Sequence, residues 1–197
     1  MPADRNRTDH QNDAIAGLLV PIARHSIQHG LRSNSPRSIK ASDLPLEIRA
    51  PGASFVTLKI GERLRGCIGT LEAHQPLGLD VNHNAYKAAF SDPRFPPLNI
   101  NECGNLNIHI SILTAPVPFP AQSEQDLLRQ IRPKQDGLYL TYANNRATFL
   151  PSVWSIFPDP NRFVNELKIK AGLPADFWSD EIQFQRYTVI DVDAGTL

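Results

Sequence analysis

Residues 64–71 read Leu-Arg-Gly-Cys-Ile-Gly-Thr-Leu, and this stretch predicts a β-strand with an irregular backbone. The apolar run Phe55–Leu58 precedes it, and turn-like residues at 60–63 separate the two, which favours a β-hairpin. Two glycines within four positions weaken a strand, so we expect them where the backbone bulges or another group approaches it closely. The stretch therefore predicts a hairpin built around Cys67.

Cys67 is the candidate reactive residue of this hairpin. Side chains alternate between the two faces of a strand, so Arg65 and Cys67 are expected on the same face, roughly 6–7 Å apart. A neighbouring guanidinium favours the thiolate, which is the nucleophilic and metal-binding form of cysteine. The residues alone leave a second interpretation open, in which Cys67 is a buried, inert cysteine of a tight hairpin.

The composition is that of a soluble globular protein. The 197 residues are 41% hydrophobic and 20% charged, which predicts one domain or two small subdomains that share a core. The formal net charge is zero, so we expect neither nucleic acid nor an anionic membrane as a partner. A polar start and the lack of a membrane-length apolar run predict a cytoplasmic protein with free thiols, although a Cys67–Cys103 disulfide stays open.

Helical and strand-like segments are interleaved without a regular β-α-β alternation, which favours an α+β fold. Apolar residues recur at helical spacing in three segments: residues 15–23, 77–90 and 163–171. The first helix is expected to be kinked or delayed at Pro21 and to end at Gly30. Strict alternation over residues 106–112 predicts a half-buried strand with His109 on its polar face.

A stiff loop follows the second of these helices. Residues 91–98 read Ser-Asp-Pro-Arg-Phe-Pro-Pro-Leu, and their three prolines fix the backbone and bias the preceding residues to extended conformations. Asp92 and Arg94 are therefore displayed with little conformational freedom, which suits the wall of a binding site. A local salt bridge that merely fastens the loop explains the same two residues equally well.

Several classes of site lack their motifs. The sequence contains no phosphate-binding glycine loop, Cys-x-x-Cys, His-Glu-x-x-His or Gly-x-Ser-x-Gly motif, so it indicates no particular cofactor and no closed zinc site. A metal site on Cys67 and His109 would lack a third ligand. Carboxylate pairs such as Asp191 and Asp193 lie in solvated-looking segments. Any chemistry must therefore come from residues that are dispersed along the chain.

Taken in order, the motifs resemble the AMMECR family, also called AmmeMemoRadiSam system protein A. The resemblance runs from about Leu18 to Tyr187. It is carried by residues 64–70, 76–77, 88–89, 92–98, 108–113, 149–151 and 167–173, together with Trp178. It implies a single AMMECR-type domain over residues 1–197, with a core at about 14–190 and flexible residues at 1–12. It also implies an α+β fold of two closely packed subdomains around a mainly antiparallel sheet.

The family's Arg-Gly-Cys-Ile-Gly motif lies in a cleft between the subdomains, and here it corresponds to residues 65–69. The resemblance thus implies a small-molecule site in that cleft. We expect Cys67 to be the catalytic nucleophile and His109 to be its base. The residues expected to bind the substrate are Arg65, Gly66, Gly69, Asp92 and Arg94.

Two positions depart from the family pattern. His109 stands where relatives usually carry glutamate, and Ser152 stands where they usually carry glutamine. Both changes alter the acid–base chemistry if these side chains belong to the cleft. Relatives are named for association with a Memo-like protein and a radical-SAM protein, which implies such partners here. The open alternative is a non-catalytic binding or assembly module in which Cys67 is structural.

Overall fold

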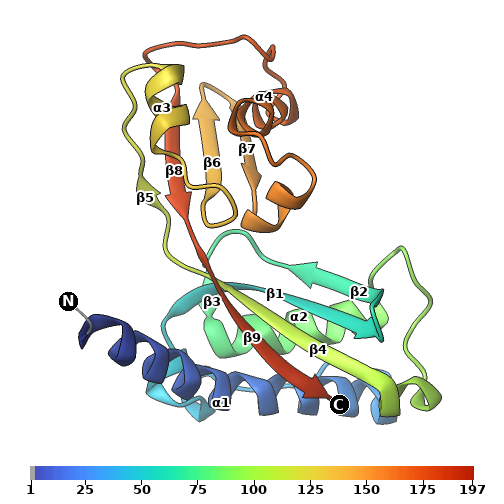
Figure 1. Cartoon of the computed structure of the whole chain (residues 1–197). Helices are drawn as coiled ribbons and strands as arrows, with labels where there is room; N and C mark the ends of the chain where they lie inside the picture. Colours follow the sequence, from blue (N-terminus) through green and yellow to red (C-terminus); the bar gives the residue numbers. More distant parts are fainter. Residues whose placement is uncertain (1–2) are drawn as a thin grey trace. The chain divides into compact units, whose positions relative to one another are not determined.

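The chain folds into two compact units (Figure 1). The computed structural model describes the backbone of residues 3–197 and the side chains of residues 12–197. Unit 1 comprises Met1–Leu113 and Ile190–Leu197, and unit 2 comprises Thr114–Val189. The expected flexibility of residues 1–12 falls largely outside the residues whose side chains are described, so it stays a prediction.

Unit 1 is built on a five-stranded sheet with the strand order β2-β1-β4-β9, to which the short β3 is added by pairing with β1 (Figure 1). Its elements are α1 (Ala3–Ser33), η1 (Ala41–Asp43), η2 (Leu46–Ile48), β1 (Pro51–Ile60), β2 (Arg63–Gly69), β3 (Gln75–Pro76), α2 (Leu77–Phe90), η3 (Ile100–Asn105), β4 (Leu106–Leu113) and β9 (Val189–Thr196). The last strand of the chain thus returns to lie beside β4.

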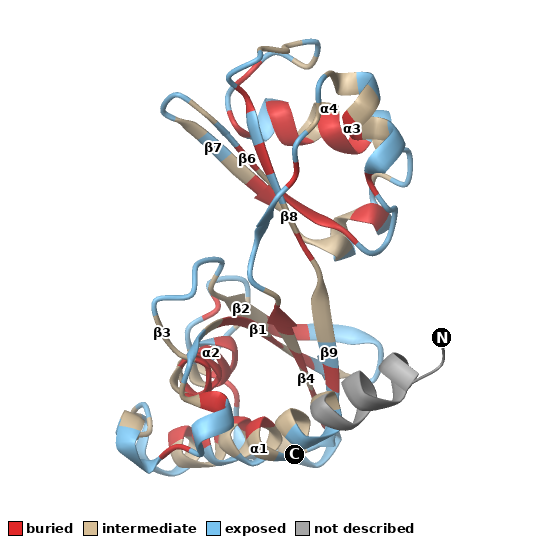
Figure 2. Cartoon of the chain, turned by 90° about the vertical axis from the view of Figure 1, so that its left-hand side faces the viewer, coloured by how far each residue is buried: buried red, intermediate tan, exposed pale blue. Residues whose placement is uncertain are grey.

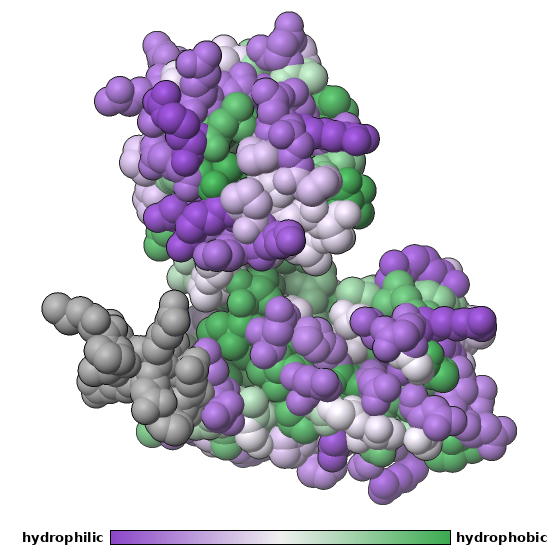
Figure 3. All heavy atoms as spheres, viewed as in Figure 1, coloured by the Kyte–Doolittle hydropathy of each residue, from purple (hydrophilic) through white to green (hydrophobic). Residues whose placement is uncertain are grey.

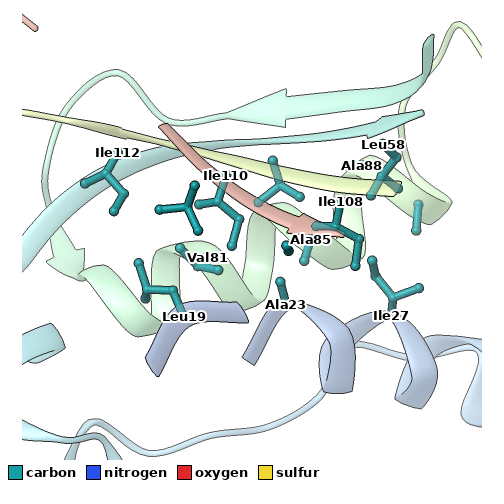
Figure 4. Packing of buried hydrophobic residues seen from close by; sticks show 14 of the residues in the cluster. Leu19, Ala23, Ile27, Leu58, Val81, Ala85, Ala88, Ile108, Ile110 and Ile112 are labelled. Carbon is teal, nitrogen blue, oxygen red and sulfur yellow. The ribbon is translucent and has the colours of Figure 1, made fainter. Parts of the chain in front are cut away.

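The core of unit 1 lies between the two α-helices and one face of this sheet (Figure 4). It includes Leu19, Ala23 and Ile27 of α1, Val81, Ala85 and Ala88 of α2, and Leu58, Ile108, Ile110 and Ile112 of the strands. The predicted alternation over residues 106–112 is confirmed, because even positions are buried in this core and odd positions are not. In Figure 2 the buried residues lie where helices and strands face one another. The other face, which α1 and α2 do not cover, is called the outer face below.

The expected end of α1 at Gly30 is wrong, because the helix continues to Ser33. Pro21 lies in the interior of the helix and does not delay its start, whereas the kink expected there stays a prediction. Asn34, with φ of 50°, adopts the left-handed conformation that commonly follows a helix end. Gly30 serves a different purpose, because a Cβ there would lie 2.2 Å from a ring carbon of Phe90 in α2. Its small size allows the two helices to pack closely.

The predicted hairpin of β1 and β2 is confirmed, but its pairing is interrupted. Leu58 pairs with Gly66, whereas Lys59 pairs with Leu64, so Arg65 is the extra residue of a β-bulge. A bulge breaks the strict alternation of side chains along a strand. The spacing argument that placed this arginine on the same face as the cysteine therefore no longer holds.

Unit 2 contains a four-stranded antiparallel sheet with the order β5-β8-β6-β7. Its elements are β5 (Val117–Pro118), α3 (Glu124–Gln130), β6 (Gly137–Tyr142), β7 (Asn145–Phe149), η4 (Pro151–Ser155), α4 (Pro160–Lys170) and β8 (Gln183–Tyr187). The core is rich in aromatic residues, and Trp154 stacks on Phe163 with ring centroids 3.9 Å apart. The predicted α+β class with mainly antiparallel sheets is confirmed.

The face of the molecule seen in Figure 3 does not single out a site by its hydropathy. Hydrophilic residues cover most of the visible face of unit 2, and unit 1 shows hydrophobic areas between its hydrophilic side chains (Figure 3). Among the described residues, no helix combines the length and the apolar character needed to cross a lipid bilayer.

Gly66 gives the first prediction, because a Cβ there would lie 2.0 Å from the backbone carbonyl oxygen of Ala88 in α2. Relief of this clash requires a shift of backbone, so Gly66→Ala should lower the free energy of unfolding by about 1–3 kcal/mol. Urea unfolding followed by circular dichroism measures the change. The matched control is Gly17→Ala on the exposed side of α1, where nothing lies within 4 Å of the added carbon. That variant should gain up to about 1 kcal/mol. A Gly66→Ala protein as stable as the wild type would contradict the close packing.

Candidate functional site

Four side chains of unit 1 form a row across the outer face of its sheet. The strand register places Cys67 of β2 opposite Thr57 of β1, and Thr57 opposite His109 of β4. The Thr57 hydroxyl donates a hydrogen bond to Sγ of Cys67 over 3.3 Å. At the other end, Nε2 of His109 lies 3.1 Å from Oδ1 of Asp191 in β9. A thiol, a hydroxyl, an imidazole and a carboxylate thus follow one another on four adjacent strands.

Asp191 orients the histidine of this row. Its Oδ1 also accepts a hydrogen bond of 2.7 Å from the hydroxyl of Ser111, which holds the carboxylate in place. When Nε2 of His109 donates to Asp191, Nδ1 is the nitrogen left free to accept a proton. The side chains of His109 and Asp191 are 40% and 60% exposed, so molecules from solution can reach the pair.

His109 and Cys67 are not neighbours. The strand β1 lies between theirs, and adjacent strands are about 4.8 Å apart, so their backbones are separated by about 10 Å. Thr57 occupies the position between them. The structure brings the two expected catalytic residues into one row, but it does not place the imidazole beside the thiol as a direct base.

The backbone of Cys67 is held from the outer edge of the sheet by the loop after α2. Its N–H donates to Oδ2 of Asp92 over 2.8 Å, and its carbonyl oxygen accepts from Nη2 of Arg94 over 3.1 Å. The N–H and C=O of a residue in an antiparallel strand point to the same side, so neither group of Cys67 bonds to β1. Cys67 and Thr57 are therefore a non-hydrogen-bonded pair, the type in which side chains approach most closely. This geometry explains the hydroxyl–sulfur contact.

Asp92 is a buried anion, only 4% exposed, with a guanidinium beside it. Arg94 donates to both carboxylate oxygens, over 2.9 Å from Nε and 2.7 Å from Nη2. The hydrogen bond from Arg94 holds the pKa of Asp92 far below its ordinary value, and backbone N–H donors add to this effect against the opposing influence of burial. Asp92 in turn raises the pKa of Arg94, with a smaller contribution from Cys67. The negative charge of Asp92 thus offsets most of the positive charge of Arg94, so little net positive charge acts on the thiol of Cys67.

Arg65 is engaged by a second carboxylate. Its Nε and Nη2 donate to the two oxygens of Glu102 over 2.6 and 3.0 Å, which raises the pKa of Arg65 and lowers the pKa of Glu102. Glu102 also accepts from the backbone N–H of Asn99 and so caps η3. The ring centroid of Phe95 lies 5.9 Å from Cζ of Arg65 and 5.5 Å from Cζ of Arg94. Arg65 ties the bulge of β2 to η3.

The two glycines of the motif make room for neighbouring groups. Gly66 lies against the backbone of α2, and a Cβ at Gly69 would lie 2.2 Å from the ring of Phe55.

A hollow of about 340 Å³ opens on the outer face and is lined by Lys59, Gly61, Glu62, Asn107, Ile108, His109, Asp193 and Gly195. The polar end of the row thus borders a space of the size of a small ligand.

Neither Ser152 nor Cys103 belongs to the row of four side chains. Ser152 belongs to η4 of unit 2, where its carbonyl oxygen accepts from the hydroxyl of Ser155. Cys67 and Cys103 are both free thiols. Burial, with a smaller effect of Glu102, raises the pKa of Cys103. Among the described residues, no group of three or more His, Cys, Asp or Glu side chains is close enough to hold a metal ion.

Sequence reasoning missed two members of the row, Thr57 and Asp191. The alternation of residues 106–112 carried the signal that placed His109 on a polar face, and β1 has the same alternation around Thr57. The partners across strands depend on register, which no local pattern contains. Asp191 was expected in a solvated segment and is indeed exposed, but it lies beside β4.

Comparisons with known proteins agree on one family. A family model named AMMECR1 matches residues 20–192. A protein from Methanothermobacter thermautotrophicus is 36% identical, covering 86% of this chain and 88% of its own. One from Sulfolobus acidocaldarius is 38% identical, covering 86% and 77%. The crystal structure of an uncharacterised protein from Pyrococcus horikoshii superposes with a TM-score of 0.71 at 32% identity, covering 87% of each chain.

Replacement of Asp92 gives the second prediction. Its pKa in the folded chain lies below the ordinary value of 3.8, so at acidic pH the unfolded chain binds a proton that the folded chain does not. The stabilisation is therefore complete above about pH 5 and is lost as the pH falls through 3.8 towards the folded value. Asp92→Asn should lower the free energy of unfolding at pH 7 by about 2–3 kcal/mol and should flatten its decline between about pH 5 and 2.

The control for this experiment is Asp176→Asn, because Asp176 is exposed. It should leave both the stability and its acid dependence unchanged. Amide hydrogen exchange adds a local measurement, and exchange at the Cys67 N–H should accelerate in Asp92→Asn alone. Unchanged exchange there would show that the carboxylate does not hold this edge of the sheet.

Proposed function

The chain belongs to the AMMECR1 family, and we propose that it binds a small molecule on the outer face of unit 1 and acts on it through Cys67. The observation that carries the proposal is the hydrogen bond that the Thr57 hydroxyl donates to the half-buried sulfur of Cys67. A donor aimed at sulfur stabilises the thiolate relative to the thiol, and the thiolate is the nucleophile. The sequence predicted that Arg65 would stabilise the thiolate, and we assign this role to Thr57 instead.

The chemistry fits an addition to an electrophilic carbon such as a carbonyl. The thiol first releases its proton to solvent. The thiolate then supplies the electron pair of a new carbon–sulfur bond, the carbon–oxygen π bond breaks, and the oxygen takes a proton from the protonated imidazole of His109. His109 recovers a proton from solvent. In this arrangement the histidine acts on the substrate, because a separation of about 10 Å leaves a small molecule room to lie over Thr57 between the two residues.

The hollow beside His109 supports a polar substrate. Lys59 brings a positive charge to its lining, and Glu62 and Asp193 bring negative charges. Arg94 is half exposed but forms an ion pair with Asp92, so the pair offers little net positive charge to a purely anionic substrate. We therefore propose a small polar molecule that carries both a hydrogen-bonding group and an electrophilic carbon.

A non-catalytic module is the second candidate, and one observation favours it. Asp92 and Arg94 form their hydrogen bonds with the backbone of Cys67. Another side chain at this position would therefore hold the loop equally well. In that case the proline-stiffened loop presents a rigid surface to a partner protein. The Memo-like and radical-SAM proteins implied by the family name are the partners to try first.

Alkylation of a single-thiol protein tests the first proposal. In a Cys103→Ser background, iodoacetamide should modify Cys67 at pH 7 faster than it modifies a free cysteine peptide. Thr57→Val removes the donor and nearly keeps the side-chain shape, so it should slow modification by about 3- to 10-fold, as expected for one hydrogen bond. Mass spectrometry of the modified peptide measures the rate.

The matched control is Ser111→Ala, which removes a hydroxyl from the same face without a contact to the sulfur. It should leave the rate at Cys67 unchanged. A rate no faster than that of the peptide, unaltered by Thr57→Val, would reject the nucleophile. Capture of a Memo-like or radical-SAM partner that survives Cys67→Ser but is lost in Asp92→Asn would then favour the module.

A further inference from the structure

The basic residues of this chain are unevenly distributed. Between Asp13 and Asp43 the sequence contains no acidic residue. The same interval holds Arg24, His25, His29, Arg32, Arg37 and Lys40. In a chain with equal numbers of acidic and basic residues, this interval is a local excess of positive charge.

Four of these side chains meet at one hollow of unit 1, with a volume of about 290 Å³. Its lining consists of His25, Gln28, His29, Arg32 and Arg37. The first four are spaced i, i+3, i+4 and i+7 along α1, so they share one stripe of the helix. Arg37 belongs to the segment after the helix and lines a second side of the hollow. Four of the five lining residues are basic and none is acidic.

Hydrogen bonds hold the backbone of both walls, while His25 and Arg32 are exposed and His29 and Arg37 are partly buried. The carbonyl oxygen of His29 accepts a hydrogen bond from Ser33, and that of Arg37 accepts one from the buried side chain of Asn82 in α2. Among the described residues, no carboxylate forms an ion pair with His25, His29, Arg32 or Arg37. Within the described part of the chain, no carboxylate therefore neutralises the positive charges that line this hollow.

The dipole of α1 explains only part of this cluster. A helix C-terminus favours cations within its last turn, and that accounts for Arg32. It does not account for His25, which lies two turns earlier, or for Arg37, which lies outside the helix. Arg32 and Arg37 are like charges at one hollow and repel one another, and a negative group supplied from solution would relieve this repulsion.

We propose that this hollow binds a small phosphate-bearing anion. Arg32 and Arg37 supply guanidinium groups, which match the geometry of phosphate oxygens, and His25 and His29 supply further N–H donors. The volume suits a phosphoryl group with a small remainder. Because the lining consists of only five residues around about 290 Å³, the hollow favours a small anion over a nucleic acid, whose backbone needs a longer run of basic contacts. None of the lining residues belongs to the row at Cys67, so the site is independent of the proposed chemistry there.

Titration of the full chain with pyrophosphate or inorganic phosphate, at constant ionic strength with chloride as the reference anion, tests the site. Two-dimensional NMR of the imidazole groups should show saturable shifts at His25 and His29, with His74 and His83 unchanged. Arg37→Ala should weaken pyrophosphate binding about tenfold, as expected for the loss of charge-assisted hydrogen bonds. Tighter binding of pyrophosphate than of phosphate would point to an esterified or condensed phosphate as the natural ligand, and equal binding to the free ion.

The matched control is Lys40→Ala, which removes one exposed positive charge outside the lining. It should change binding by less than about twofold if specific contacts dominate over diffuse charge. An equal loss in Lys40→Ala and Arg37→Ala would overturn the proposal. So would the absence of a saturable shift at both histidines in the wild-type protein, a result that does not depend on whether any variant folds.

Discussion

The carboxylate of Asp92 occupies the place that another strand would take at the edge of β2. It accepts the N–H of Cys67, while Arg94, which it holds, donates to the carbonyl oxygen of the same residue. An unprotected edge strand offers free backbone groups for unwanted pairing, and this loop covers them close to the β-bulge at Arg65. The same contact determines that Cys67 and Thr57 meet as a close, non-hydrogen-bonded pair.

The charges around the cysteine follow from this arrangement. Asp92 compensates Arg94, and Glu102 compensates Arg65, so each arginine of the two motifs belongs to a structural ion pair. Exposed or partly exposed pairs contribute modestly, but the burial of Asp92 makes its partner necessary. The donor that remains close to the sulfur is a neutral hydroxyl. The reactivity proposed for Cys67 therefore depends on its hydrogen bond from Thr57 more than on the positive charges of the two arginines.

The predictions that succeeded were those carried by local patterns. Residues 106–112 alternate because one face of β4 packs on two helices, and the hairpin was visible from its apolar runs and turn. The predictions that failed needed distant information. Gly30 resembled a helix end because glycine has that role in isolation, whereas here it makes room for Phe90. The bulge at Arg65 depends on how β2 pairs with β1, and neither strand alone specifies that pairing.

The α+β class, the hairpin, the loop after α2 and the family could all be inferred from residue order, because periodicity, proline content and ordered motifs are local properties of the chain. Which side chains meet became known only from the folded chain. Thr57, His109 and Asp191 lie far apart along the sequence, and they share one row because strand register brings β1, β4 and β9 into the same sheet. The physical reason is that a sheet aligns residues by backbone hydrogen bonds between strands, and those bonds carry no trace in the sequence of a single strand.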